Sequence, residues 1–239
     1  MSWADVLDAL FGPHHKVIAD GDFLEGSAIL SDSGAGPGNT IAIVGTTNHA
    51  PIGYELALRQ ARIVLDTITR HPGRPILLLI DTQGQRLSRR DELLGINRAM
   101  AHLGCVIDLA RRRGHRVIGL VYDQALSGGF ITSGLIADAC YALPQAEIRV
   151  MRLPAMARVT KLPEAMLAEL SRSNPVFAPG VDNYVAMGGV RSLWRGDLAA
   201  ALREALADGG TQDTRARDGA QRGGRQHAAE TIRRVLDAA

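Results

Sequence analysis

Three short runs of uninterrupted apolar residues constrain the fold of this chain more than any other feature. They are residues 41–44 (IAIV), 75–80 (PILLLI) and 117–122 (VIGLVY). A strand with one face in water alternates polar and apolar residues, whereas a continuous apolar run is typical of a strand buried on both faces, usually a parallel strand beneath helices. The sequence therefore predicts a sheet that is covered by helices on both sides.

The segments between these runs have the periodicity of amphipathic helices. Residues 54–71 and residues 91–113 both place apolar side chains at spacings of three or four. Strands and helices that alternate at this spacing predict an α/β fold with right-handed crossover connections.

The carboxyl-terminal part of the chain differs in composition from the rest. Residues 197–208 have a helical pattern, whereas residues 209–226 consist of Gly, Arg, Asp and Gln with almost nothing apolar. We therefore expect one domain over residues 1–208, a flexible linker over 209–226 and a short last helix over 227–239.

Charge and hydropathy exclude several classes of function. The formal net charge of +2 gives little electrostatic basis for binding nucleic acid. No apolar run approaches the roughly 20 residues of a membrane span, and the chain begins with an early Asp5 in place of a basic signal-peptide region. We expect a cytoplasmic protein that binds neither nucleic acid nor a membrane.

Two polar, glycine-bearing segments follow the second and third apolar runs. They are residues 81–85 (DTQGQ) and residues 123–130 (DQALSGGF). Ligands in open parallel sheets bind beyond the carboxyl ends of the strands, so we expect the functional site where these two turns meet. Asp81 ends the second run, and we expect its side chain to cap the turn that follows.

Gly128 and Gly129 precede an apolar segment, residues 130–137, that we expect to be helical. The first N–H groups of a helix have no partner within the helix, lie at the positive end of its dipole, and are open to a ligand when the residues are glycine. Two interpretations follow from the residues alone. The glycines form an oxyanion hole for a thioester oxygen, or they allow a close contact between helix and strand.

Ser127 lies at a strand-to-helix turn, the place where several hydrolases present a nucleophile. No histidine occurs between residues 128 and 226, and His115 lies upstream, so we expect no Ser/His nucleophile and regard Ser127 as a turn residue that hydrogen-bonds substrate. The histidines and cysteines show no metal-ligand spacing, and we expect no metal site. These residues are His14, His15, His49, His71, His102, His115, His227, Cys105 and Cys140.

Three segments resemble biotin-dependent carboxyltransferases. Residues 75–84 (PILLLIDTQG) are similar to their first strand and Asp-Thr-Pro-Gly turn, residues 116–134 (RVIGLVYDQALSGGFITSG) to their second strand and glycine-rich helix start, and residues 137–143 (ADACYAL) to the strand that follows. Gln83 stands where the carboxyltransferases have proline, which argues against a biotin-binding role for this turn. The chain as a whole, including Trp3, resembles malonate decarboxylase γ subunits most.

The resemblance implies an α/β fold of the ClpP/crotonase type, a spiral of β-β-α units like the C-terminal half of a carboxyltransferase. It implies a decarboxylase, a carbon–carbon lyase, that converts malonyl to acetyl and CO2 on the phosphopantetheine-type arm of an acyl carrier protein. The expected partners are a β subunit, in a heterodimer or higher oligomer, the acyl carrier protein and an acyl carrier protein transferase. No cofactor is expected on this chain itself.

The same resemblance favours the oxyanion-hole interpretation of Gly128 and Gly129, whose backbone N–H groups would stabilise the thioester enolate. The substrate-binding residues that we expect are Ser127, Phe130, Gln83, Gly84, Thr46 and Thr47. Two alternatives remain. The chain is a carboxyltransferase subunit that passes the carboxyl group to biotin, or it is a non-catalytic half whose β partner supplies the chemistry.

Overall fold

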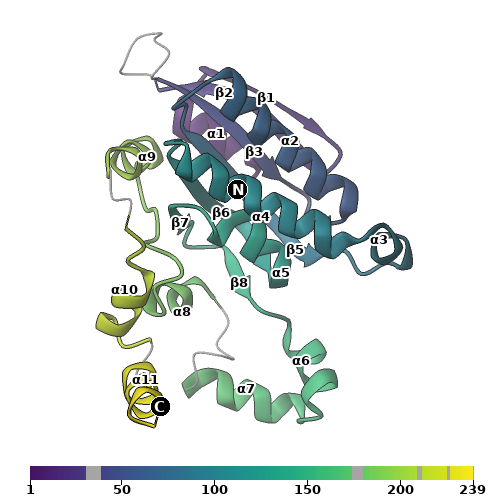
Figure 1. The fold of residues 1–239 in the computed structure, drawn as a ribbon, viewed down its shortest axis with the longest axis vertical. Helices are drawn as coiled ribbons and strands as arrows, with labels where there is room; N and C mark the ends of the chain where they lie inside the picture. The colour runs from purple at the N-terminus through teal and green to yellow at the C-terminus, as the bar shows by residue number, and fades with distance from the viewer. Residues whose placement is uncertain (31–38, 174–179, 209–211, 225–226, 239) are drawn as a thin grey trace.

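An eight-stranded mixed sheet forms the centre of the protein. The computed structural model describes residues 1–30, 39–173, 180–208, 212–224 and 227–238 (Figure 1). The strands are β1 (His15–Asp20), β2 (Phe23–Ile29), β3 (Thr40–Thr46), β4 (Ala50–Ile52), β5 (Ile76–Gln85), β6 (Val117–Leu126), β7 (Ala139–Ala142) and β8 (Glu147–Arg149). Their order is β1-β2-β3-β5-β6-β7, with β4 beside β5 and β8 beside β6.

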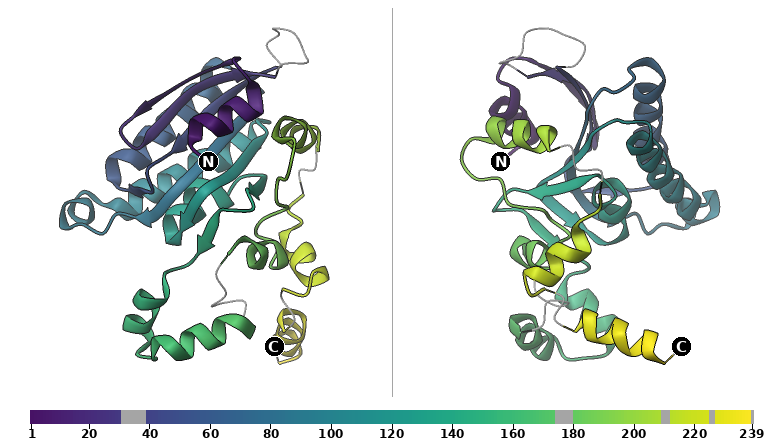
Figure 2. Two further views of the ribbon diagram at one scale, coloured as in Figure 1. Left: turned by 180° about the vertical axis from the view of Figure 1, so that it is seen from behind. Right: turned by 60° about the vertical axis from the view of Figure 1, so that its left-hand side comes forward.

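Helices cover both faces of this sheet. The larger helices are α1 (Trp3–Phe11), α2 (Tyr54–Arg70), α4 (Ile96–Arg112) and α9 (Leu198–Ala207). Buried residues of α2 and α4 share one apolar cluster with Ile76, Leu78 and Ile80 of β5. Buried residues of α1 and α9 share the opposite cluster with Leu77 and Leu79 (Figure 2). The three apolar runs thus form β3, β5 and β6, which pair in parallel, and the prediction of a doubly covered sheet is confirmed.

The sheet is larger than the sequence predicted. Strands β1 and β2 form an antiparallel hairpin that pairs with β3 and that we did not expect. The segments 81–85 and 123–126, which we expected to be turns, continue as strand because β4 pairs with the end of β5 and β8 with the end of β6.

Two of the expected helices are divided. Residues 91–113 contain α3 (Arg89–Leu94) and α4, separated by Gly95, which has a left-handed backbone with φ of +83°. This conformation ends α3 after fewer than two turns. The helix expected over residues 130–137 consists of α5 (Ser127–Phe130) and a π-helical turn, η1 (Ile131–Leu135).

The carboxyl-terminal region is helical over most of its described length. The prediction for residues 197–208 is confirmed by α9, whose first turn is capped by the Asp197 side chain. The linker prediction is wrong for residues 215–221, which form α10 (Arg215–Gln221), while residues 209–211 and 225–226 lie outside the described part of the chain. The short last helix is present as α11 (Ala228–Asp237).

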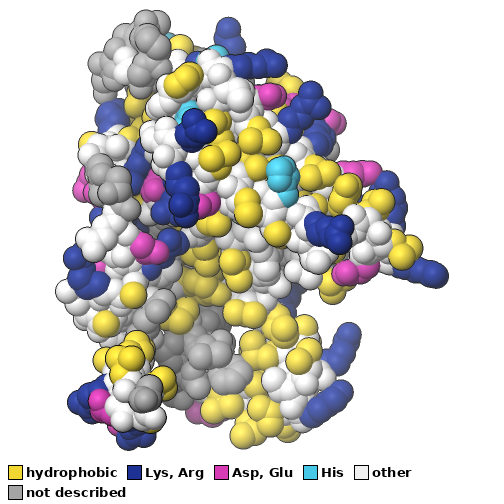
Figure 3. Space-filling view, viewed as in Figure 1, with side chains coloured by type: hydrophobic (Ala, Val, Ile, Leu, Met, Phe, Trp, Pro, Cys, Tyr) yellow, Lys and Arg dark blue, Asp and Glu magenta, His cyan; other side chains and the backbone are white. Residues whose placement is uncertain are grey.

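Three helices extend away from the sheet with apolar side chains on their surfaces. They are α6 (Leu153–Thr160), α7 (Glu164–Ser173) and α11, below the core in Figure 1. Val159, Met166, Ile232, Val235 and Leu236 are all exposed. In Figure 3, hydrophobic side chains gather on this lower part of the molecule and on the core surface above it. Within the described segments, no helix is both long and apolar enough to cross a membrane.

Candidate functional site

The ends of β5 and β6 meet through backbone-to-backbone contact. A Cβ atom at Gly129 would lie 2.8 Å from Cα of Gly84, and a Cβ atom at Gly84 would lie 2.9 Å from Cβ of Ser127. Both distances are shorter than real Cβ contacts, so side chains are excluded at both glycines. Close packing of helix against strand is therefore enough to require glycine at residue 129. A role of its N–H group in an oxyanion hole is a separate question.

Gly128 has a different environment. A Cβ atom there would approach only Oε1 of Gln85, at 2.9 Å, and that atom is the far end of a flexible side chain. Ser127, just before it, has a left-handed backbone with φ of +56°, which turns the chain sharply from β6 into α5. At the start of this helical segment, the first N–H groups have no acceptor one turn earlier in the helix.

Two cavities flank this turn. Cavity A has a volume of about 280 Å³ and cavity B a volume of about 300 Å³. Cavity A is lined by Gln85, Glu92, Ile96, Asn97, Met100, Gly128, Ile131 and Thr132. Cavity B is lined by Ser127, Gly128, Phe130, Ile131, Leu135, Arg149, Val150, Tyr184 and Met187. Gly128 and Ile131 line both cavities, so Gly128 lies between two partly apolar cavities.

The structure brings some of the predicted site residues together here. Ser127 and Phe130 line cavity B, and the buried Phe130 ring packs edge-to-face on Tyr184 with ring centroids 6.2 Å apart. Gly84 lies beneath the turn as the packing partner of Gly129 and Ser127.

Three predicted substrate contacts lie elsewhere. Thr46 and Thr47 are buried at the end of β3, where the Thr46 hydroxyl accepts the N–H of Asp81 at 3.3 Å. Gln83 is exposed on β5. None of the three lines cavity A or cavity B.

Sequence reasoning missed several polar residues that line these cavities, including one from β5 and two from more distant segments. Gln85 lines cavity A, while Arg149 and Tyr184 line cavity B. Gln85 follows the glycine turn directly, so its position in the strand was a usable signal. Arg149 and Tyr184 come from segments more distant in the chain, and no local pattern connects them with the turn.

His115 does not approach Ser127. It is buried just before β6, where its Nδ1 lies 2.9 Å from the carbonyl oxygen of Arg74, whereas Ser127 follows the last residue of β6. The extended strand between them is roughly 30 Å long at about 3.3 Å per residue. This separation agrees with the expectation that these two residues form no nucleophilic pair.

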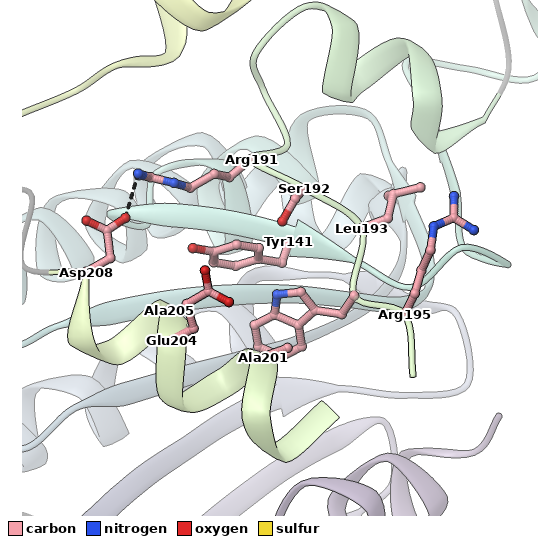
Figure 4. Close-up of a pocket in the computed structure, with 10 residues that line it drawn as sticks. Tyr141, Arg191, Ser192, Leu193, Arg195, Ala201, Glu204, Ala205 and Asp208 are labelled. Atoms are coloured by element: carbon pink, nitrogen blue, oxygen red, sulfur yellow. Dashed lines mark ion pairs between the residues drawn. The ribbon is translucent and has the colours of Figure 1, made fainter. Parts of the chain in front are cut away.

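A third cavity, cavity C, lies beside β7 and α9 and has a volume of about 420 Å³ (Figure 4). Tyr141 and Trp194 stack in its wall with ring centroids 5.0 Å apart, and Arg191 forms an ion pair with Asp208 at 2.5 Å. None of the predicted site residues lines this cavity. Volume alone therefore does not make it the functional site.

Asp81 does not cap its own turn as we expected. Its Oδ2 accepts the N–H of His49 at 2.9 Å, from the segment between β3 and β4. The turn is held by Thr82, whose hydroxyl accepts the N–H of Gly84 at 3.0 Å. Burial is the main cause of a raised pKa at the Asp81 carboxyl. The side chain thus connects β5 to a neighbouring loop.

Comparison with known proteins gives consistent matches. Two crystal structures of Pseudomonas malonate decarboxylase resemble this chain, a hetero-tetramer in complex with coenzyme A and an MdcD-MdcE hetero-dimer. The first has a TM-score of 0.77 and 25% identity, and the match covers 100% of this chain and 99% of that chain. The second has a TM-score of 0.73 and 26% identity, with 97% and 96% covered.

A curated relative is the malonyl-S-ACP:biotin-protein carboxyltransferase MADD of Malonomonas rubra. It is 36% identical over 151 residues, which cover 59% of this chain and 52% of the relative, so the chain spans about half of that protein's length. These likenesses identify the fold as the mixed α/β fold of malonate decarboxylases and carboxyltransferases. The family model for the malonate decarboxylase gamma subunit matches residues 47–239, well over half of the sequence, and the chain belongs to that family.

Proposed function

We propose that this chain, together with a β subunit, decarboxylates a malonyl thioester carried on an acyl carrier protein, giving the acetyl thioester and CO2. Membership of the gamma subunit family supports the reaction. The name of the Malonomonas relative supports a malonyl group on a carrier protein, and the Pseudomonas hetero-dimer supports a paired subunit. The single observation in this chain that supports the proposal is the position of Gly128, at the start of a helical segment and between cavities A and B.

The chemistry requires charge stabilisation more than a reactive side chain. The bond between the carboxylate carbon and the α-carbon breaks, CO2 leaves, and the electron pair remains as an enolate with charge on the thioester oxygen. The N–H groups of Gly128 and Gly129 donate to that oxygen, and removal of one such donor typically costs about 2.7–4 kcal/mol. A proton then joins the α-carbon to give the acetyl group.

Binding of the substrate uses the walls of the two cavities. The apolar parts of cavities A and B accept the phosphopantetheine-type arm and the malonyl group, and Phe130 forms part of the wall of cavity B. The Ser127 hydroxyl hydrogen-bonds substrate and has no covalent role. We add Gln85, whose amide lies beside Gly128, as a further polar contact. The carrier protein and its transferase complete the proposed set of partners.

A biotin-dependent carboxyltransferase is the second candidate, because the Malonomonas relative is named as one. In that reaction the carboxyl group passes to biotin on a partner protein in place of leaving as CO2. Avidin distinguishes the two. We expect CO2 release from the malonyl carrier protein to be unaffected by avidin, whereas inhibition would favour the carboxyltransferase.

Gly128→Val and Ser127→Gly, prepared in the co-expressed complex, test the role of the Gly128 amide. A valine side chain at residue 128 displaces only the flexible Gln85 amide, so the protein folds, but it fills the approach to the N–H groups. We expect kcat to fall about a hundredfold or more at saturating substrate. Ser127→Gly suits the left-handed backbone and should keep kcat within a few-fold.

The control is an unchanged thermal midpoint and unchanged association with the β subunit in both variants. If Gly128→Val retained full turnover, the chain would be a non-catalytic half of the complex. If Ser127→Gly alone abolished turnover, a serine-based mechanism would replace the oxyanion hole.

A further inference from the structure

A second polar cluster lies at the carboxyl ends of the central strands, apart from the residues that line cavities A and B. His49 lies in the turn between β3 and β4, Asp81 on β5 and Asp123 on β6. One potential ligand atom from each residue lies within 4.8 Å of the other two. Nothing in the proposed decarboxylation uses this cluster.

A local irregularity of the sheet brings the two carboxylates together. Ile80 pairs with Val121 but Thr82 pairs with Ala125, so three residues of β6 stand opposite Asp81 alone. Such a bulge redirects side chains at the end of a strand, which is a common device next to binding sites.

The Asp81 carboxylate is only partly satisfied. Its side chain is 3% exposed, and Oδ2 accepts the His49 N–H, but Oδ1 is buried with no hydrogen-bond partner among the described residues. Nε2 of His49 lies 3.7 Å from this oxygen, too far for a hydrogen bond. A buried carboxylate oxygen without a donor is unfavourable, so a ligand at this position would relieve the cost.

The spacing of the three groups matches a single metal ion. Nε2 of His49 lies 3.1 Å from Oδ2 of Asp123 and 3.7 Å from Oδ1 of Asp81. Ligands at about 2.0–2.2 Å from one ion, at tetrahedral or octahedral angles, lie about 2.8–3.6 Å from each other. The two distances from His49 lie in or close to this range, and the two carboxylate atoms lie within 4.8 Å of each other.

We propose that His49, Asp81 and Asp123 bind one divalent transition-metal ion, with Zn²⁺ as the best match. One imidazole nitrogen with two carboxylate oxygens suits zinc and its neighbours better than Mg²⁺, which prefers oxygen ligands alone. Water completes the coordination on the exposed side, because His49 and Asp123 are each about half exposed. The ion neutralises two adjacent carboxylates and attaches the β3–β4 turn to the ends of β5 and β6.

Zinc titration of the full chain in its complex tests this proposal. The protein is first stripped with a chelator, then titrated with Zn²⁺ by calorimetry, and the visible absorption of bound Co²⁺ gives a second readout. We expect saturable binding of one ion per chain. His49→Asn and Asp123→Asn should each weaken binding by more than about tenfold, the smallest loss typical of an outer-shell partner. Asparagine at residue 49 suits its left-handed backbone, which has φ of +51°.

The pair His15–Asp8 provides the matched control, because Nε2 of His15 and Oδ1 of Asp8 also lie 3.1 Å apart. Asp8→Asn should leave zinc binding unchanged. Absence of saturable binding by the wild-type complex would overturn the proposal, and so would binding that survives both His49→Asn and Asp123→Asn. Asp81→Asn is a third variant that should also weaken zinc binding, and the two half-exposed positions decide the question without it.

Discussion

Adjacent glycines at residues 128 and 129 have different roles, which only the structure separates. A methyl group at residue 129 would collide with Gly84 backbone atoms at 2.8 Å, and backbone cannot move aside cheaply. We expect Gly129→Ala to lower the free energy of unfolding by about 1–3 kcal/mol. Gly128→Ala should not be destabilising, because only the Gln85 side chain must move and alanine favours a helix.

Thermal unfolding of the two alanine variants beside wild type measures this difference. Equal stability of Gly129→Ala and wild type would mean that the backbone around Gly84 can shift at little energetic cost. A bulky residue at position 129 would consequently be a poor probe of an oxyanion hole, since loss of packing and loss of a donor would coincide.

The raised pKa of Asp81 gives a pH-dependent prediction for the metal-free protein. Burial favours the neutral acid in the folded state, so its pKa lies above the unfolded value of 3.8. The resulting destabilisation is absent below pH 3.8, grows as pH rises through the folded pKa, and is complete above it. With a chelator present, Asp81→Asn should therefore stabilise the protein at pH 7, and the gain should shrink toward pH 3.8.

Thermal midpoints of Asp81→Asn and wild type across that pH range provide the measurement. A difference in thermal midpoint that stayed constant at every pH would show that burial does not raise the pKa of the Asp81 carboxyl. Zn²⁺ should reverse the order at pH 7 if the proposed site is occupied, because only the wild type gains from binding.

The sequence predicted candidate site residues that lie together in the chain, and it did not connect candidates that the fold assembles from separate segments. Ser127, Gly128 and Phe130 are consecutive or nearly so, and a strand-to-helix turn is visible in their order. The expectation of no metal site rested on spacing along the chain. His49, Asp81 and Asp123 come from three separate segments, which no local spacing connects.

At the scale of elements, a buried carboxylate joins α2 to α3. Oδ1 of Asp91 accepts the N–H of Tyr54 at 2.7 Å, and Oδ2 accepts the Ser88 hydroxyl. The backbone N–H of Asp91 in turn donates to the Ser88 hydroxyl at 3.1 Å. The Ser88 hydrogen bond and the Tyr54 N–H hold the pKa of Asp91 below 3.8. This contribution to stability is present above pH 3.8 and is lost as pH falls through the folded pKa.

We expect Asp91→Asn to lower the free energy of unfolding at pH 7 by about 1.5–3 kcal/mol, the usual range for hydrogen bonds to a charged group. The deficit should shrink as pH falls below 3.8. Glu92→Gln, one residue along the same helix and exposed, should have little effect. Urea titrations at several pH values test the pair, and a Glu92→Gln loss as large as that of Asp91→Asn would contradict the assignment.

The two carboxyl-terminal helices differ in how firmly they attach. Arg222, which follows α10, donates to the carbonyl oxygen of Val185 at 2.9 Å, and backbone of Arg215 packs against Gly188 so closely that a Cβ there would lie 2.2 Å from it. No residue of α11 is buried. We expect a chain that ends at residue 227 to keep the wild-type thermal midpoint, whereas one that ends at residue 208 melts lower. Equal midpoints for both truncations would show that the α10 contacts add little stability.

Strands and helices with an unbroken apolar or helical pattern could be predicted from the sequence. A strand at the edge of the sheet and a helix boundary that depends on a single glycine could not. Strand β1 lies at the edge of the sheet, and none of its residues is buried. Its sequence therefore lacks the apolar pattern by which a strand is predicted. Gly95 divides a helix that the apolar period alone extends without interruption. The ends of β5 and β6 are rich in polar residues and glycine, and we therefore predicted turns there. They remain strands because each pairs with a short strand, β4 or β8.

At the scale of the whole molecule, the apolar surface indicates that this chain works as part of an assembly. Val159 is 68% exposed on α6, and on α11 Val235 and Leu236 are 64% and 70% exposed. Exposed apolar side chains gathered on one part of a protein mark an interaction surface. The similar Pseudomonas chain is part of a hetero-dimer.

We therefore expect an obligate heteromer. The chain expressed alone should self-associate or aggregate, and co-expression with its β subunit should give one stable complex, because burial of this apolar surface removes it from water. Light scattering after size-exclusion chromatography measures both states. Val235→Glu with Leu236→Glu should make the isolated chain more soluble, and should weaken the complex if α11 lies in the interface. A chain that is monomeric, stable and fully active in decarboxylation without any partner would contradict this prediction.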